Sequence, residues 1–264
     1  MLSTVKTLKG CALTALDGEI GRVKEFYFDD RHWTIRYLVA GTGTWLPGRQ
    51  VLISPYALVA INKDIFEPQI KINLTREQIE NSPSLDSDKP VSRQYEESYN
   101  GYYDWPSYWS GSHEWGSSPH IERDREKWGE IPMEGGTPSP DPFLRSTNAV
   151  SGYHIDAEDG QIGHVEDFVI DDETWAIRYL MVNTNNFWPG KKVLISPRWI
   201  ESVSWGQSRV FINLSRETIK RSPEYTEEFL ITRDYETELH RYYHRQGYWS
   251  GELVASDREY PVTG

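Results

Sequence analysis

A pattern of alternating polar and apolar positions occurs twice along the chain. The first copy is Asp17–Val39 (DGEIGRVKEFYFDDRHWTIRYLV) and the second is Asp159–Met181 (DGQIGHVEDFVIDDETWAIRYLM). Each copy opens with an Asp-Gly turn and runs through a segment rich in β-branched and aromatic residues to an Asp-Asp turn. It then returns through a strand that starts at a tryptophan. This pattern is typical of a β-hairpin, and it indicates an architecture rather than a ligand.

The repeat extends beyond the hairpin. From Asp17 to Ile61 the two copies align without a gap at an offset of 142 residues (159 − 17), and 21 of the 45 aligned positions are identical. Further along, Ile70 aligns with Val210, so the offset becomes 140 (210 − 70). Such self-similarity indicates a duplicated structural unit. The missing two residues fall where a hairpin loop would tolerate a change in length.

Within one copy, the apolar runs and turn signals predict a small all-β unit. We expect strands at residues 11–16, 20–28, 34–40, 50–53, 58–62 and 69–72. Several short strands with regular turns suggest a small barrel or sandwich. A short helix should follow, with Thr75 as N-cap and Gln78 as its capping-box partner. Ser215 takes the place of Thr75 in the second copy, but Thr218 cannot complete the box.

A second repeated unit follows each predicted barrel, at residues 92–111 and 232–251. Its tyrosines recur at helical spacing, which predicts an amphipathic helix with an aromatic face, and it ends in a Tyr-Trp-Ser-Gly turn. This face covers either its own barrel or the opposite barrel or a partner chain. We expect a pseudo-two-fold molecule in which the aromatic tails fill the space between the barrels.

These patterns divide the chain into five parts. We expect a first barrel at residues 1–83, a first aromatic tail at 84–111, a linker at 112–146, a second barrel at 147–223 and a second tail at 224–264. The linker is rich in proline and includes one candidate helix around residues 121–128. The expected fold class is therefore mainly β, with two small barrels in tandem, each followed by short helices.

Charge and composition narrow the classes of function. The formal net charge is −12 and no Lys/Arg cluster is present, which argues against direct binding of nucleic acid. Cys11 is the single cysteine, so no internal disulfide can form, and we expect a buried strand thiol. The sequence contains neither an apolar run of about 18 residues nor a signal-peptide pattern, so we expect a cytoplasmic protein with no transmembrane segment.

Five residues are candidates for contacts with a protein partner. Arg36 and Arg178 lie in the middle of equivalent predicted strands, where alternation should turn them outward. We expect each to form a structural ion pair or ring stack, and a docking contact is the alternative. The chain has 11 tryptophans; the equivalent Trp33 and Trp175 are expected in the core. The candidates in the tails are Trp105, Trp109 and Trp249.

Other groups of polar residues are weaker candidates for chemistry. His240 and His244 share a helical spacing that suits a metal ion, but we expect them to be solvent-facing polar residues. The Asp-Asp pairs are adjacent in a turn, which favours a turn role over a cation site or acid–base catalysis. No phosphate loop, dinucleotide fingerprint or nucleophile elbow is present. We therefore expect no catalytic residues, no cofactor and no metal.

The combination of a DG turn, IG-V, a D-D turn, W-IRYL and V-L-I-S-P resembles the PRC-barrel family over roughly residues 5–83 and 147–223. This is the barrel shared by the H subunit of photosynthetic reaction centres and the C-terminal domain of the bacterial ribosome-maturation factor. The resemblance implies a protein- or ligand-docking barrel and not an enzyme. The chain lacks the membrane helix of the former and the separate N-terminal barrel of the latter, so neither function transfers whole.

The leading functional expectation is a non-enzymatic bacterial adaptor or assembly module that binds a protein partner. One alternative is a role in photosynthetic electron transport like that of the reaction-centre H subunit. A second alternative is ribosome assembly through a small-subunit ribosomal protein. The two barrels are expected to form a pseudo-dimer within one chain, and further oligomerisation remains open.

Overall fold

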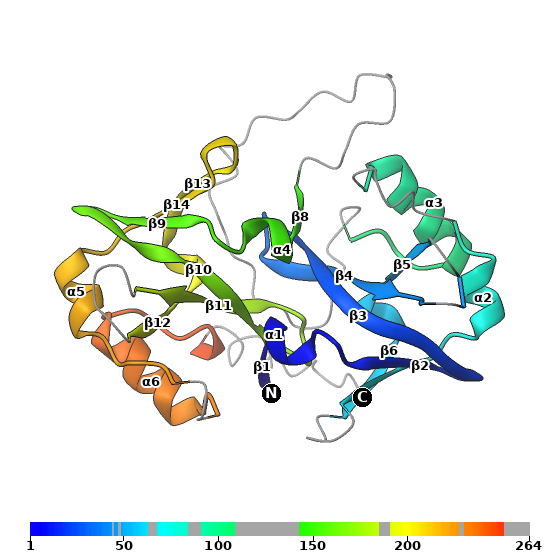
Figure 1. Ribbon diagram of the computed structural model, residues 1–264. Coiled ribbons are helices and arrows are strands. Elements are labelled where there is room, and N and C mark those ends of the chain that lie inside the picture. Colours follow the sequence, from blue (N-terminus) through cyan, green and yellow to red (C-terminus); the bar gives the residue numbers. More distant parts are fainter. Residues whose placement is uncertain are drawn as a thin grey trace, which may run out of the picture.

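The computed structural model describes residues 1–43, 45–46, 49–62, 68–83, 91–108, 143–184, 191–226 and 230–250. Within these residues it contains two seven-stranded sheets and six short α-helices, which confirms the mainly β tandem architecture. The two sheets lie side by side (Figure 1). We call residues 1–108 the first half and residues 143–250 the second half.

The two sheets have the same topology. The first has the order β5-β4-β3-β2-β7-β6 and the second β12-β11-β10-β9-β14-β13. In each, one pair is parallel, β2 with β7 and β9 with β14, and the other pairs on these paths are antiparallel. The strands of the first sheet are β2 (Ala12–Ala15), β3 (Gly18–Asp29), β4 (Thr34–Gly41), β5 (Gln50–Ile53), β6 (Leu58–Asn62) and β7 (Gln69–Ile72). Those of the second are β9 (His154–Ala157), β10 (Gly160–Asp171), β11 (Ile177–Asn183), β12 (Lys192–Ile195), β13 (Ile200–Ser204) and β14 (Arg209–Ile212).

All six strands expected in the first copy are present, with ends within two residues of the prediction. The difference in length between the copies lies in the connection from β6 to β7 and from β13 to β14, as predicted. The structure shows why one of the shared glycines, Gly21, is required. A Cβ at this position would lie 2.0 Å from the carbonyl oxygen of Gly41, so the close approach of β3 to β4 requires glycine. Gly163 has the same relation to Asn183 in the second sheet.

The helices are short, with four to eleven residues each. They are α1 (Val5–Leu8), α2 (Arg76–Glu80), α3 (Arg93–Tyr103), α4 (Thr147–Val150), α5 (Arg216–Arg221) and α6 (Arg233–Tyr242). The described residues also contain the 3₁₀ turns η1 (Pro55–Ala57), η3 (Pro197–Trp199) and η4 (Trp205–Gln207). The capping box of Thr75 and Gln78 is formed at α2, and Ser215 caps α5, so both cap predictions are confirmed. The helix expected around residues 121–128 lies outside the described residues.

The two halves exchange their first strands. β1 (Leu2–Thr4) pairs with β10 of the second half, and β8 (Leu144–Ser146) pairs with β3 of the first half. The short helices that follow, α1 and α4, lie between the two sheets (Figure 1). Each sheet is therefore completed by a strand from the other half, a pairing that the local sequence pattern does not indicate.

Two tryptophans join the halves at the centre. The amide of Ile35 donates to the carbonyl of Trp175 at 2.8 Å, and the amide of Ile177 donates to the carbonyl of Trp33 at 2.7 Å. Both rings are buried, as predicted. Phe28 stacks on Trp33 at 5.3 Å and contacts Phe168 of the other half at 5.7 Å. One hydrophobic core therefore runs through both halves, and we call the exchanged strands with the two tryptophans the seam.

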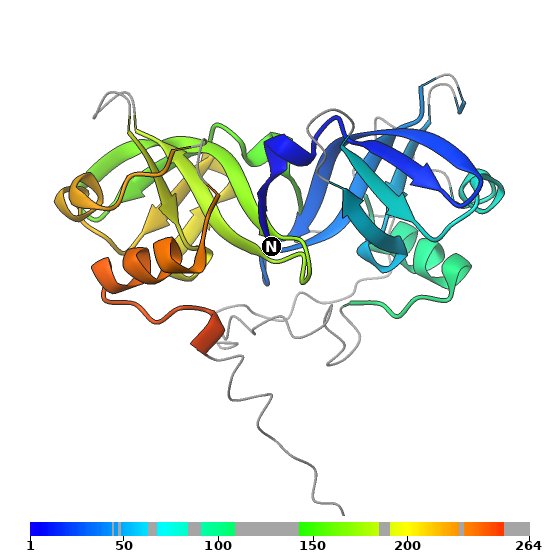
Figure 2. The ribbon, with the colours of Figure 1, turned by 90° about the horizontal axis from the view of Figure 1, so that it is seen from below.

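The aromatic helices cover their own sheets. In Figure 2, α3 lies against the first half and α6 against the second. The Tyr99 hydroxyl of α3 donates to the carbonyl of Leu52 at 2.8 Å, and Trp199 packs on Tyr243 at 4.6 Å in the second half. The prediction that the tails fill the space between the barrels is therefore wrong for these helices. Seam contacts hold the halves together instead.

Among the described residues, no helix is both long enough and apolar enough to cross a membrane. The thiol of Cys11 is buried, as expected.

Candidate functional site

Each half contains an equivalent polar site where its aromatic tail meets its β-hairpin. Arg36 comes from the middle of β4 and Arg178 from β11, and only 3% and 5% of their surfaces are exposed. The aromatic tails cover the side of the strands on which these arginines lie, so neither side chain is exposed to solvent. Nearly every residue of β4 is buried, because the barrel core covers one face and the tail covers the other, so strand alternation does not sort polar from apolar side chains here.

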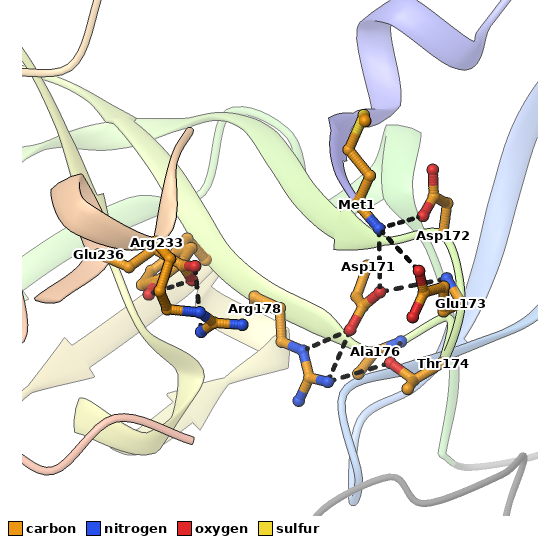
Figure 3. Close-up of polar contacts among 10 residues, drawn as sticks. Met1, Asp171, Asp172, Glu173, Thr174, Ala176, Arg178, Arg233 and Glu236 are labelled. Carbon is orange, nitrogen blue, oxygen red and sulfur yellow. Dashed lines mark hydrogen bonds and ion pairs between the residues drawn. The ribbon is translucent and has the colours of Figure 1, made fainter. Parts of the chain in front are cut away.

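An aspartate at the end of the preceding strand fixes each arginine. Arg36 Nη2 donates to Asp29 Oδ2 at 3.2 Å, and Arg178 Nη2 donates to Asp171 Oδ2 at 2.8 Å (Figure 3). The predicted ion pair is thus confirmed at both positions. Burial alone would raise the pKa of Asp29, but hydrogen bonding to His32 and the charge of Arg36 outweigh it and hold that pKa well below its usual range.

The same aspartates make the predicted turn contacts. Asp29 accepts from the amide of Arg31 at 2.8 Å, and Asp171 accepts from the amide of Glu173 at 3.1 Å. The turn role expected for the Asp-Asp pairs is therefore confirmed.

A buried glutamate on each tail helix forms the other side of the site. Glu96 of α3 is fully buried, and the Tyr37 hydroxyl of β4 donates to its Oε1 at 3.0 Å. Glu236 of α6 accepts from the Tyr179 hydroxyl at 2.9 Å. Burial raises the pKa of Glu236, although hydrogen bonds from tyrosines and the nearby arginines oppose this effect.

A second arginine accompanies each glutamate. Arg233 Nη1 lies 3.2 Å from Glu236 Oε2 (Figure 3), and Arg93 Nη1 lies 3.7 Å from Glu96 Oε2. These contacts connect the first turn of each tail helix to the buried carboxylate.

A tyrosine from the Tyr-Trp-Ser-Gly turn occupies each site. The ring of Tyr108 lies under the guanidinium of Arg36 at 4.2 Å, and its hydroxyl donates to Glu96 Oε1 at 2.8 Å. In the second half, the ring of Tyr248 lies 3.9 Å from the guanidinium of Arg178, and its hydroxyl is hydrogen-bonded to Glu236. In both halves, a tyrosine side chain is thus held by the same two interactions, a cation–π contact and a charge-assisted hydrogen bond.

We call these sites the first and second cradles. The first cradle consists of Arg36, Tyr37, Arg93 and Glu96, and the second consists of Arg178, Tyr179, Arg233 and Glu236. Tyr248 also lines a small pocket with His32 and Thr34, so the turn after α6 reaches the seam.

The tryptophan candidates have different surroundings. Trp249 is half-buried beside the second cradle, 4.2 Å from the guanidinium of Arg233 and 5.0 Å from the ring of His240. Trp105 is half-buried in the aromatic cluster of the first tail, where it stacks on Tyr103 at 4.4 Å. Trp109 lies outside the described residues. The structure therefore brings Arg178 and Trp249 together at one site, while Trp105 belongs to a neighbouring cluster.

The histidine pair does not share a face. His240 is buried and its Nε2 lies 3.0 Å from the Tyr179 hydroxyl, whereas His244 is exposed just beyond the helix. The expectation that both are solvent-facing is wrong for His240. Within the part of the chain that the structure describes, no three His, Cys, Asp or Glu side chains gather as a metal site would require.

The tyrosines and glutamates of the cradles were not among the sequence candidates. A signal for them exists, because Glu96 aligns with Glu236 and Tyr108 with Tyr248 at the offset of 140. A charged residue kept in both copies of an otherwise aromatic helix face indicates a polar partner inside the fold.

Comparison with known proteins identifies one domain. A family model of the PRC-barrel domain matches residues 155–219, which run from β9 into α5. The first sheet repeats the strand order of the matched region, so the chain contains two barrel-like units. No curated protein matches the chain.

Proposed function

We propose that this chain is a non-enzymatic adaptor or assembly module that binds protein partners through its tail-covered barrels. The observation that carries the proposal is the duplicated cradle. In each half, a barrel arginine contacts the ring of a tyrosine from the turn after the tail helix, and a glutamate of that helix is hydrogen-bonded to the tyrosine hydroxyl. A barrel and tail helix that together bind a short turn of their own chain have the contacts needed to bind a turn of another protein.

The fused arrangement supports an assembly role. The seam joins both units through exchanged strands and one core, so the two cradles are held by a single scaffold. A scaffold with two similar sites can engage two parts of a partner, and the second contact then gains from a high effective concentration. The match to the PRC-barrel domain is consistent with this role.

Site-specific photo-crosslinking in cells of the source organism tests the proposal. A photoreactive amino acid replaces His32, whose side chain is 40% exposed. His32 contacts Asp29, the partner of Arg36 in the first cradle, and lines a pocket with Arg178 and Tyr248 of the second, so a probe at this position lies near both cradles. The matched control replaces Leu16, which is exposed at the far end of β2. We expect a discrete protein adduct at residue 32 and none at residue 16. Absence of any adduct at residue 32, or identical adducts at both positions, would contradict the proposal.

The captured chain would also separate the narrower roles. Reaction-centre or light-harvesting subunits would support a photosynthetic role, and a small-subunit ribosomal protein would support ribosome assembly. Each result would support the adaptor proposal.

A further inference from the structure

The first cradle differs from the second in how tightly it encloses its tyrosine. We propose that the first cradle is a binding site for an unmodified tyrosine presented on a turn of a partner protein, which exchanges with the chain's own Tyr108. This inference rests on the proposed function and names the chemistry of the partner. It is carried by the two seated tyrosines, which serve as bound examples of the ligand.

The contacts define what the cradle accepts. The guanidinium of Arg36 covers the ring face of Tyr108, and Glu96 accepts from its hydroxyl. A phenylalanine offers the ring but no donor, so it leaves a buried carboxylate without one of its hydrogen bonds. A phosphotyrosine places a second negative charge against Glu96 and is repelled. The cradle is therefore selective for the unmodified phenol.

The cradle is built without Tyr108. Asp29 fixes Arg36 from within β3, while the Tyr37 hydroxyl and Arg93 fix Glu96. Because these partners belong to the barrel and to α3, removal of Tyr108 leaves the two recognition groups in position. Such a preformed site binds a ligand with little further ordering.

Tyr108 is less enclosed than Tyr248, which favours its replacement by a partner's tyrosine in the first cradle. Tyr248 is 6% exposed and its neighbour Trp249 adds contacts to His240 and Arg233. Tyr108, in contrast, is only half-buried. The own tyrosine is also tethered, so it competes at high effective concentration with any partner. Removing it should therefore strengthen the binding of an added tyrosine peptide.

The test uses the full-length chain and a labelled peptide that copies residues 105–111 (WPSYWSG). Fluorescence anisotropy is measured with the wild type, Tyr108→Ala and the control Tyr102→Ala, which removes an exposed tyrosine from α3. If Tyr108 occupies the first cradle in about nine tenths of the wild-type molecules, only about one tenth can bind the peptide. Tyr108→Ala should then bind the peptide about tenfold more tightly than the wild type. Tyr102→Ala should bind like the wild type.

Two further peptides test the chemistry, with phenylalanine or phosphotyrosine in place of the central tyrosine. We expect weaker binding of the first and no measurable binding of the second. Equal binding of the three peptides, or equal binding by the wild type and Tyr108→Ala, would overturn the inference.

If Tyr108→Ala does not fold, a second variant, Tyr108→Phe, tests the inference. Tyr108→Phe keeps the ring and lacks the hydroxyl, so it should also bind the tyrosine peptide more tightly than the wild type, and failure to do so overturns the inference. A protein adduct at residue 32 together with failure of the peptide would leave the adaptor proposal standing and remove the tyrosine inference. Selective peptide binding without an adduct at residue 32 would remove the adaptor proposal and leave only the selectivity of the first cradle for a tyrosine side chain.

Discussion

Trp33 and Trp175 combine full burial with an unusual backbone. Their φ angles are 52° and 60°, in the left-handed region that bulky residues avoid. The surrounding structure maintains this conformation, because each tryptophan carbonyl accepts a hydrogen bond from the opposite half. The two residues therefore contribute to the seam with both their rings and their backbones.

Replacing either tryptophan with alanine should be strongly destabilising. Loss of a buried large ring costs about 3–5 kcal/mol in the free energy of unfolding, and both rings are at most 5% exposed. Urea denaturation of Trp33→Ala and Trp175→Ala measures this cost. Leu16→Ala, at an exposed position, is the control and should change the free energy by less than about 0.5 kcal/mol. A tryptophan variant as stable as this control would contradict the prediction.

His240 should make stability depend on pH. Burial lowers its pKa to about 4, so the folded protein resists a proton that the unfolded chain takes up below about pH 6.5. The free energy of unfolding should therefore fall as the pH decreases from 6.5 towards 4.

His240→Asn should remove this part of the pH dependence, and asparagine is already tolerated at the equivalent Asn100. The comparison of variant and wild type isolates the histidine, because Glu236, whose raised pKa acts in the opposite direction, is present in both. Chemical denaturation at several pH values provides the measurement. Parallel pH profiles of the two proteins would show that His240 is not the cause.

At the scale of elements, the hairpins followed from the sequence and the pairing of the halves did not. Turn chemistry and apolar alternation located the strands, since both are local signals. β1 and β8 have only three residues each and pair with strands more than 110 positions away, so no local pattern indicates them. The burial of Arg36 could not be predicted for a related reason, because only the tertiary packing of the tail shows that β4 is covered on both sides.

Removal of β1 should disturb the second sheet more than the first. Deletion of residues 1–4 takes away the partner strand of residues 169–171 in β10 and the Met1 carbonyl that accepts from the Asp172 amide at 3.1 Å, so hydrogen exchange in this segment should become faster. The equivalent residues 27–29 of β3 pair with β8, which the deletion leaves intact, and they serve as the internal control. Hydrogen exchange followed by mass spectrometry distinguishes the two sites. Faster exchange confined to the first sheet would contradict the observed pairing.

At the scale of the whole molecule, the seam turns two small units into one. A barrel of this size buries limited apolar surface by itself, whereas here most of the buried apolar residues of both halves form one continuous cluster, and a smaller separate cluster lies under the first tail. The cradles were missed for a similar reason, because their tyrosine, arginine and glutamate come from separate segments that only the complete fold brings together.

The shared core predicts that the described halves unfold together. Differential scanning calorimetry of the full chain should show one transition, and Trp33→Ala should lower its midpoint without splitting it. Two separate transitions in the wild type would mean that the seam does not couple the halves.

The contacts across the seam are reciprocal, with Ile35 bonded to Trp175 and Ile177 to Trp33, as they are in a two-fold symmetric dimer. In a symmetric dimer of identical chains, every substitution appears on both sides at once and must suit both. Fusion into one chain lifts that symmetry constraint, so each side can change alone. In the alignment of the two tails, Tyr99 corresponds to Leu239 and Asn100 corresponds to His240, so the copies already differ at these positions. The fused seam thus preserves a common scaffold while the two cradles are free to diverge from each other.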